Sequence, residues 1–396
     1  MIKNRQNDSW RKFPILQQPK WADIYNHTAI LSKLEKLPSL VFSGETRKLK
    51  KELSQVNVGE NFILQIGNCS ESFSDCNGPR IHNFVRIMMQ MVLAISYHSN
   101  KNIIKIGRIA GQYAKPRSAD TEIVNGIELP TYRGDMVNSY EPNLQDRQAD
   151  SDRLLEGYFR SAATLNLLRA FTQGGYNEVR NLLDWKNHFF FKEITDMNYY
   201  NILEKELAIS IKGSQTKLKK KYNDPNIYTS HEALLLDYEE AFTRIDTTTG
   251  DFYNTSAHML WVGDRTRQIE GAHVEFMKGI GNPVGIKVGP NHRVDEIAEV
   301  VKLINPENDN GKIILIIRLG INNIELALEK LIKEIKNRNL NVIWCCDPMH
   351  GNTFAHSGFK VRSFNDIINE TKLFIQICKS EKVTPGGIHL EITGDY

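Results

Sequence analysis

Short runs of apolar, mostly β-branched residues recur along the chain. Seven of these runs are continuously apolar rather than alternating, which is typical of strands buried on both faces of a parallel sheet. Amphipathic helical patterns separate the later runs, over residues 294–304, 322–337 and 363–379. The pattern predicts repeated strand–helix units of an α/β fold, with strands at 61–69, 102–111, 257–264, 282–290, 312–320, 341–348 and 386–393.

Two regions depart from this alternation. Residues 1–55 are mixed and polar, with a helical pattern at 45–55, and we interpret them as an N-terminal extension. Residues 145–250 lack any apolar run that would predict a strand, and we interpret them as a helical insertion after the second strand. The length suits one large domain, so we expect a single catalytic domain over residues 1–396.

The insertion contains two helical patterns, at residues 152–171 and 230–244. Thr229 and Glu232 have the spacing of a capping box, which predicts that the second helix begins there. The basic run at 217–222 is most simply the solvated end of a helix rather than a phosphate or nucleic-acid site.

Composition and charge narrow the class of protein. The chain has 396 residues, of which 41% are hydrophobic and 24% charged, and its net charge of +3 is too small to indicate a nucleic-acid partner. The N-terminus has no apolar signal segment, and no run approaches the roughly eighteen apolar residues of a membrane span. We expect a cytoplasmic protein with reduced thiols, because its five cysteines are few, odd in number and scattered: Cys69, Cys76, Cys345, Cys346 and Cys378.

All seven predicted strands end in a titratable or metal-capable side chain. In an α/β barrel the chemistry lies at the carboxyl ends of the strands. A charge after any single strand is usually an ordinary surface residue, but seven such ends together indicate a site. In chain order they are Cys69 with Glu71, Arg108, Asp264 with Arg265, Lys287, Arg318, Asp347 with His350, and Glu391.

These residues sort into two kinds of chemistry. Four cations come from four different strands and can converge on one anion, because arginine forks match phosphate and carboxylate oxygens. Three other strand ends supply a thiol, an imidazole and a carboxylate, a ligand set that suits Mn, Fe, Co or Zn. The cations are Arg108, Arg265, Lys287 and Arg318, and the candidate ligands are Cys69, His350 and Glu391.

The adjacent Cys345 and Cys346 lie inside a predicted strand, not at its end. Successive strand residues alternate faces, so we interpret both as core residues and not as a redox pair. His350 is the better ligand candidate in that stretch, and its case depends on Cys69 and Glu391.

Several long motifs, in this order, carry a family resemblance: "GNCSESF", "IGRIAGQYAKPRS", "LPTYRGDMVN", "SHEALLLDYEEAFTR", "WVGDRTRQ", "GNPVGIKVGP", "CCDPMHGNT" and "GGIHLEITGD". Together they resemble the type II, plant-like 3-deoxy-D-arabino-heptulosonate 7-phosphate (DAHP) synthases. The resemblance implies a (β/α)8 TIM barrel, a homo-oligomer and a divalent metal, commonly Mn or Co, with Zn, Fe or Cd as further candidates. It also implies condensation of phosphoenolpyruvate with erythrose 4-phosphate, the first step of the shikimate pathway to the aromatic amino acids.

The resemblance also implies roles for individual residues. Metal ligands would be Cys69, His350 and Glu391. The phosphoenolpyruvate site would comprise Arg108, Arg265, Lys287 and Arg318, flanked by Trp261 and Asp264. The aldose-phosphate site would comprise Lys115, Arg117 and Ser118. Among these residues, the catalytic roles would fall to Lys287, Asp264 and His350.

The sequence departs from the family pattern at two points. At the position of Asp264 the family more often has glutamate, which would reach further. The resemblance also implies an eighth strand with its helix and an aspartate that is the fourth metal ligand. The apolar runs here number seven, so we expect that strand, its helix and the aspartate to be missing. Such a barrel would keep unpaired strand edges and be weakly active and less stable.

Two alternative functions therefore stay open. One is a catalytically impaired homologue that binds phosphorylated metabolites or pairs with a complete subunit. The other, without the family resemblance, is another metal-dependent aldolase acting on sugar phosphates, for which cleavage rather than condensation is expected.

Overall fold

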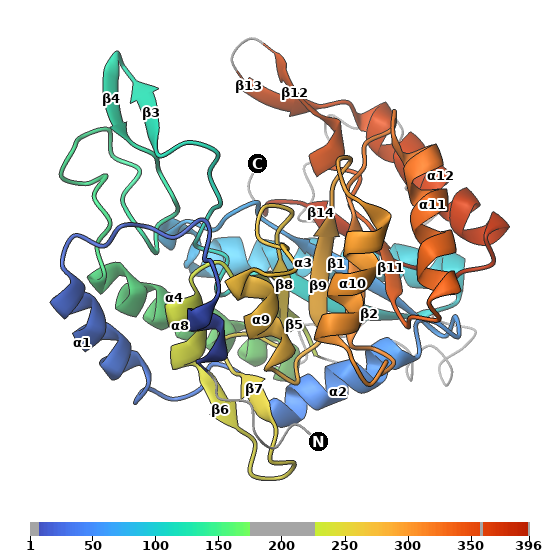
Figure 1. Ribbon diagram of the computed structural model, residues 1–396, viewed down its shortest axis with the longest axis horizontal. Coiled ribbons are helices and arrows are strands. Elements are labelled where there is room, and N and C mark those ends of the chain that lie inside the picture. Colours follow the sequence, from blue (N-terminus) through green and yellow to red (C-terminus); the bar gives the residue numbers. More distant parts are fainter. Residues whose placement is uncertain (1–7, 175–225, 357–358, 395–396) are drawn as a thin grey trace.

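Eight parallel strands close into a barrel in the computed structural model, which describes residues 8–174, 226–356 and 359–394 (Figure 1). Around the barrel the order is β1-β14-β11-β10-β9-β8-β5-β2. The strands are β1 (Asn61–Gly67), β2 (Asn102–Arg108), β5 (Tyr228–Glu232), β8 (Met259–Val262), β9 (Val284–Val288), β10 (Ile313–Ile317), β11 (Ile343–Cys346) and β14 (Pro385–Glu391). All seven predicted strands are confirmed as barrel strands.

The eighth strand is β5, which lies inside the region expected to be helical. It pairs with β2 through Gly107 and Thr229, and with β8 through Ser230 and Met259. The expectation that residues 145–250 hold no strand is therefore wrong, and so is the capping box, because Thr229 and Glu232 lie in a strand. The helix predicted at 230–244 is reduced to the short α8 (Leu236–Ala241).

The strand nearest the end of the chain completes the barrel. β14 pairs in parallel with β1 on one side and with β11 on the other. The expectation that one barrel strand is missing and that strand edges are unpaired is therefore wrong. The expected absence of the family's last helix and of the aspartate ligand stays a prediction.

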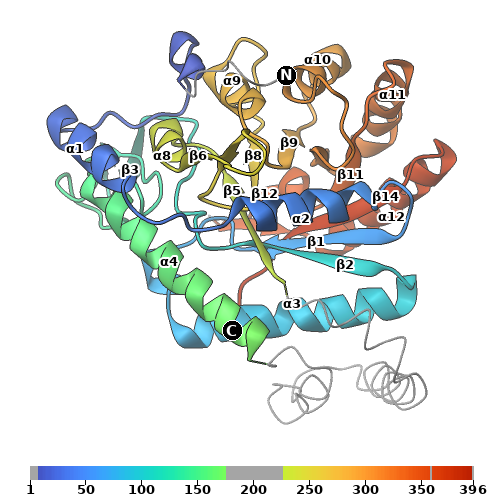
Figure 2. The same cartoon turned by 90° about the horizontal axis from the view of Figure 1, so that it is seen from below.

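Helices cover the outside of the barrel (Figures 1 and 2). The predicted helix at 294–304 is confirmed with the same bounds, and those at 45–55, 152–171, 322–337 and 363–379 are confirmed within two residues. Of the insertion, residues 175–225, including the basic run at 217–222, lie outside the described residues. The helices are α1 (Ile24–Leu34), α2 (Ser43–Ser54), α3 (Gly78–Ser99), α4 (Asp152–Gln173), α9 (Ala272–Lys278), α10 (Val294–Ile304), α11 (Ile324–Asn337) and α12 (Phe364–Ser380).

Alternate residues of the strands face two separate cores. The inward residues pack inside the barrel, and α2 closes its amino-terminal end with Leu49 and Leu53 (Figure 2). The outward residues pack against the surrounding helices. Cys345 belongs to the inner core and Cys346 to the outer one, so both are buried core residues as predicted. All five cysteines lie within the described residues and are free thiols.

Two hairpins rise from the same end of the barrel (Figure 1). They are β3 (Thr121–Val124) with β4 (Ile127–Pro130), and β12 (Thr353–His356) with β13 (Phe359–Arg362). The latter follows β11, so this is the carboxyl end of the strands. A third hairpin, β6 (Thr243–Ile245) with β7 (Phe252–Asn254), lies at the opposite end.

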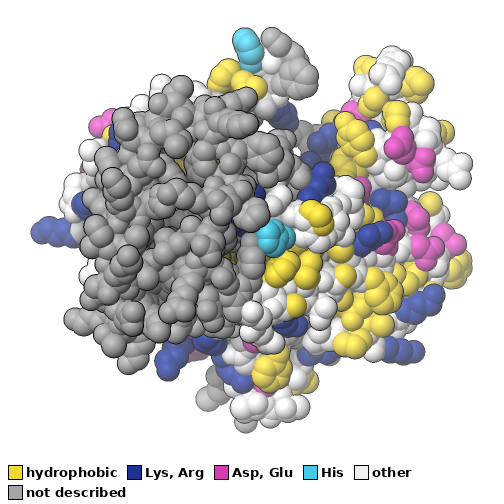
Figure 3. Space-filling view, turned by 180° about the vertical axis from the view of Figure 1, so that it is seen from behind, with side chains coloured by type: hydrophobic (Ala, Val, Ile, Leu, Met, Phe, Trp, Pro, Cys, Tyr) yellow, Lys and Arg dark blue, Asp and Glu magenta, His cyan; other side chains and the backbone are white. Residues whose placement is uncertain are grey.

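The described surface has mixed character. On the face seen in Figure 3, acidic and basic side chains are interspersed with apolar ones. Within the described ranges, no helix combines the length and the hydropathy that crossing a membrane requires.

Candidate active site

A cavity of 730 Å³ opens at the carboxyl ends of the barrel strands, between the two hairpins. Polar side chains from seven of the eight strand ends line it, and Glu391 at the end of β14 contacts His350 beside it. Eleven of the twelve predicted site residues line this cavity: Cys69, Arg108, Lys115, Arg117, Ser118, Trp261, Asp264, Arg265, Lys287, Arg318 and His350. The fold thus brings the predicted residues to one place.

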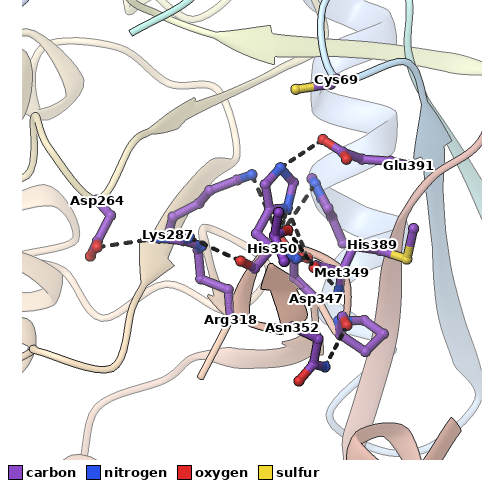
Figure 4. Close-up of polar contacts among 12 residues, drawn as sticks. Cys69, Asp264, Lys287, Arg318, Asp347, Met349, His350, Asn352, His389 and Glu391 are labelled. Atoms are coloured by element: carbon purple, nitrogen blue, oxygen red, sulfur yellow. Dashed lines mark hydrogen bonds and ion pairs between the residues drawn. The ribbon is translucent and has the colours of Figure 1, made fainter. Parts of the chain in front are cut away.

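The three predicted metal ligands converge on one point. The ligand atoms of Cys69, His350 and Glu391 lie within 4.8 Å of one another, and Figure 4 shows the three side chains together. Nε2 of His350 is 2.7 Å from Oε1 of Glu391. Its other ring nitrogen, Nδ1, is 2.7 Å from Oδ2 of the fully buried Asp347. A carboxylate behind the imidazole is the usual support of a metal-binding histidine, so the residues fit a divalent cation.

The pKa shifts of the three candidate ligands favour a bound cation where their side chains converge. Burial would lower the pKa of His350, but Asp347 raises it to about 9. Burial would raise the pKa of Glu391, but His350, Arg108 and Arg362 hold it well below its usual range. Burial would raise the pKa of the Cys69 thiol, but the hydrogen bond with His350 and the charges of Arg108 and Lys115 together lower it. A thiol and a carboxyl that ionise easily are suitable ligands for a divalent metal.

A second group of candidate ligands, Asp347, His350 and His389, overlaps the first. Here protein cations already occupy the ligand atoms. Nζ of Lys287 is 3.5 Å from Oδ2 of Asp347, and Nη1 of Arg108 is 2.9 Å from Nε2 of His389. We therefore assign this group to the cation cluster and not to a second metal.

The four predicted cations surround the cavity. Arg108 and Lys287 are buried, and burial lowers the pKa of Lys287 although Asp347 opposes the shift. Nη1 of Arg318 lies 3.4 Å from Oδ2 of Asp264, and Arg265 donates to Oγ of Ser118 at 3.0 Å. Among the described residues, the buried Nε atoms of Arg108 and Arg318 have no hydrogen-bond partner. They are donors available to a bound anion.

The predicted aldose-phosphate residues lie in the loop after β2. Nη2 of Arg117 is 2.7 Å from Glu122 on β3, so part of this guanidinium is already paired within the protein. Lys115 lies over the ring of Tyr132, with its Nζ 6.0 Å from the ring centroid. Ser118 joins this loop to Arg265 at the end of β8. The loop therefore lines one side of the cavity and shares a contact with the cation cluster.

A buried carboxylate holds the start of that loop. Both oxygens of Glu71 accept hydrogen bonds from backbone N–H groups, at 2.8–3.0 Å. Ala110, one of the three donors, has a φ of +62°, which is unusual for a residue with a side chain. Burial raises the pKa of Glu71 to about 7, against the opposing effect of the three hydrogen bonds. The other two donors are Gly111 and Gln112.

Sequence reasoning missed Glu232, which ends β5 and lines the cavity. Burial raises its pKa, while Lys287 and Arg108 oppose the shift. A (β/α)8 barrel needs eight strands, and only seven were predicted. The long interval between the second and third predicted strands was therefore the place to look for the eighth. Lys360 and Arg362 of β13 were also missed, and Arg362 pairs with Glu391.

Comparisons with known proteins agree with these findings. The model of the class-II DAHP synthetase family matches residues 5–396. A Streptomyces coelicolor protein named phospho-2-dehydro-3-deoxyheptonate aldolase is 41% identical over 391 residues, which cover 98% of this chain and 87% of the relative. A Neurospora crassa protein of the same name is 38% identical over 407 residues, which cover 98% of this chain and 84% of the relative.

Proposed function

The chain belongs to the class-II DAHP synthetase family, and we propose that its cavity condenses phosphoenolpyruvate with erythrose 4-phosphate to DAHP and phosphate. One observation carries this proposal most directly. Four cations from four strands share one cavity with the convergent thiol, imidazole and carboxylate of Cys69, His350 and Glu391. An anion site beside a cation site suits a phosphorylated enol and an aldehyde.

Phosphoenolpyruvate carries a phosphate and a carboxylate, so it needs several donors. Lys287 supplies a buried charge, and Arg108 and Arg318 supply donors that have no partner among the described residues. Asp264 holds Arg318 by an ion pair at 3.4 Å, which makes it a positioning group for that arginine. We assign the phosphate of the aldose to Lys115, Arg117 and Ser118 at the other side of the cavity.

Cys69, His350 and Glu391 would hold the divalent metal, Mn or Co, which when bound polarises the aldehyde carbonyl as a Lewis acid. The cations hold the enol so that its C3 meets the aldehyde carbon and forms the new bond. Water then adds at C2 and phosphate leaves. Glu232, a buried carboxyl with a raised pKa, is the cavity group best suited to take the proton from this water.

The proposed substrates are soluble metabolites, and the cytoplasmic location stays a prediction from the sequence. The homo-oligomeric state also stays a prediction. Neither of the alternative functions has a specific observation in its favour, because the barrel is closed and the family is that of the synthases.

The test is an assay of the purified chain with Mn²⁺ or Co²⁺ and both substrates. Equal consumption of the two substrates, release of phosphate and loss of activity with a chelator are expected. Cleavage of ketose phosphates without condensation would instead identify an aldolase. Binding of phosphoenolpyruvate without turnover would identify an impaired homologue.

A charge reversal tests the anion site itself. Lys287→Glu should abolish phosphoenolpyruvate binding in calorimetry and leave the circular dichroism spectrum unchanged. The matched control is Lys330→Glu, at an exposed lysine on α11. Wild-type affinity of Lys287→Glu would show that the assignment of the anion site is wrong.

A further inference from the structure

A chain of buried hydrogen bonds crosses the barrel interior beneath the cavity. Nη1 of Arg108 lies 2.9 Å from Nε2 of His389, and Nδ1 of His389 lies 2.8 Å from Oε1 of Gln65. Nε2 of Gln65 donates to Oγ of Ser230 at 3.0 Å, and this hydroxyl donates to the carbonyl of Gly107 at 3.0 Å. Gln65, Ser230 and His389 are fully buried, and Arg108 is 2% exposed.

Strand register places these residues side by side. Gln65 and His389 are direct partners in the parallel pairing of β1 with β14, and both face the barrel interior. Ser230 belongs to β5, and Gly107 and Arg108 end β2. The chain of contacts thus links β14, β1, β5 and β2.

The direction of every hydrogen bond in this chain follows from its first member. An arginine side chain has donors and no acceptor, so Nε2 of His389 must be the acceptor and carry no proton. Nδ1 then carries the proton and donates to Oε1 of Gln65. The amide nitrogen of Gln65 consequently donates to the hydroxyl of Ser230, and this hydroxyl donates to the carbonyl oxygen of Gly107. The alternative acceptor for a proton on Nε2, Oδ2 of Asp347, is 3.9 Å away and beyond hydrogen-bonding distance.

This contact is one of three that hold the Arg108 guanidinium, and Nη1 also lies 3.7 Å from Oε1 of Glu391. Nη2 donates to the carbonyl of Cys69 at 3.0 Å, and Nη1 donates to His389. With both terminal nitrogens engaged, the plane of the fork is fixed, and the buried Nε has no partner among the described residues. The ring of Trp261 packs edge-on against His389, with centroids 5.8 Å apart, and also lies 5.5 Å from the Arg108 carbon Cζ. Figure 4 shows His389 beside His350, and their ring centroids are 6.2 Å apart.

We infer that His389 is a positioning residue: Gln65 holds it in the Nδ1–H form, so its bare Nε2 sets the orientation of the Arg108 guanidinium for binding of the phosphoenolpyruvate anion. This inference rests on the proposed function. It assigns roles to interior residues that do not line the cavity. It also explains why polar side chains occupy the middle of strands β1, β5 and β14, where apolar residues would pack more simply.

Two variants at one position separate the hydrogen bonds from the packing. His389→Phe keeps a ring against Trp261 and removes both hydrogen bonds. His389→Gln supplies one acceptor and one donor, as the neutral imidazole does. Calorimetry measures phosphoenolpyruvate binding to the Mn²⁺-loaded full chain without erythrose 4-phosphate. We expect His389→Phe to raise the Kd at least about tenfold, and His389→Gln to stay within about threefold of wild type.

Steady-state kinetics provide a second readout. The KM for phosphoenolpyruvate should rise in His389→Phe, while the KM for erythrose 4-phosphate should stay unchanged, because the hydrogen bonds act through Arg108. A general loss of folding would instead lower the apparent kcat and leave both KM values unchanged. His273→Phe is the matched control, since it replaces another buried histidine by the same ring outside the cavity. This control should bind phosphoenolpyruvate with wild-type Kd.

Non-additivity tests whether the effect passes through Arg108. Arg108→Lys removes the fork, so adding His389→Phe to it should produce no further change in Kd. Gln65→Met removes the acceptor that keeps His389 in the Nδ1–H form, so it should also raise the Kd for phosphoenolpyruvate. This variant replaces His389→Phe in the test if His389→Phe fails to fold. Additive effects, or wild-type binding by both His389→Phe and Gln65→Met, would overturn the inference. Absence of phosphoenolpyruvate binding by the wild-type chain would instead overturn the proposed function on which it rests.

Discussion

Asp264 reaches Arg318 across an intervening strand. Asp264 follows β8 and Arg318 follows β10, yet Oδ2 of the aspartate lies 3.4 Å from Nη1 of the arginine. The other carboxylate oxygen accepts from the backbone N–H of Gly289, just after β9, at 3.1 Å. Asp264 is shorter than the glutamate of the family pattern, but it still links the ends of β8, β9 and β10.

The first prediction concerns the charge of Asp264. Asp264→Asn should raise the KM for phosphoenolpyruvate about tenfold, because a hydrogen bond to a charged group is worth about 1.5–3 kcal/mol. Asp264→Glu keeps the charge with one additional methylene and should change the KM less. Steady-state kinetics with both substrates measure the difference. Equal effects of the two substitutions would show that the charge is not what holds Arg318.

The second prediction concerns the metal. Cys69→Ser should weaken Mn²⁺ binding at least about tenfold. Removing a residue that only hydrogen-bonds a metal ligand already lowers metal affinity about 10–100-fold, and Cys69 is a candidate ligand itself. Cys76→Ser is the control, because Cys76 is partly buried outside the convergent group. Titration calorimetry of chelator-treated protein provides the affinity. Equal metal affinity of the two variants would remove Cys69 from the site.

The third prediction concerns the loop held by Glu71. Both carboxylate oxygens accept backbone hydrogen bonds, but in Glu71→Gln one of them becomes an amide nitrogen that faces another donor. We expect a loss of about 2 kcal/mol in the free energy of unfolding, because a buried donor is left without an acceptor. Urea denaturation measures it. An unchanged midpoint would mean that the loop keeps its conformation without the second oxygen.

The fourth prediction is a pH dependence of stability from His273. The side chain is buried, donates to the carbonyl of Leu234 at 3.1 Å, and burial lowers its pKa to about 4. Above an unfolded pKa of about 6.5 both states are neutral and the group contributes nothing. As pH falls towards 4, the unfolded chain binds a proton that the folded chain does not, so stability decreases.

Between pH 7 and pH 5 this loss amounts to about 2 kcal/mol for His273 alone, at 1.36 kcal/mol per pKa unit. In His273→Gln the loss over that interval should be smaller by this amount. Other titrating groups are common to both proteins and cancel in the comparison. Urea midpoints at the two pH values provide the measurement, and parallel pH profiles would contradict the assignment.

The sequence alone determined the seven strands whose runs are mainly apolar and the charged residues that follow them. Continuous apolar runs identify strands buried on both faces, and parallel strands bring their carboxyl ends to one end of a barrel. For that reason the linear pattern is sufficient to group the cations, and to group the candidate ligands Cys69, His350 and Glu391. Their convergence within 4.8 Å agrees with that grouping.

Only the tertiary structure identified β5 and the interior hydrogen bonds. Ser230 is buried in β5, and its hydroxyl is paired with Gln65 and with the carbonyl of Gly107, both distant in the sequence. The adjacent His231 is also buried, and its Nε2 lies 2.7 Å from Glu239 of α8. A strand whose buried side chains are polar has no hydropathy signal, and its residues resemble a helix start when read locally. Barrel closure and the orientation of Arg108 both depend on such long-range partners, which a linear pattern does not contain.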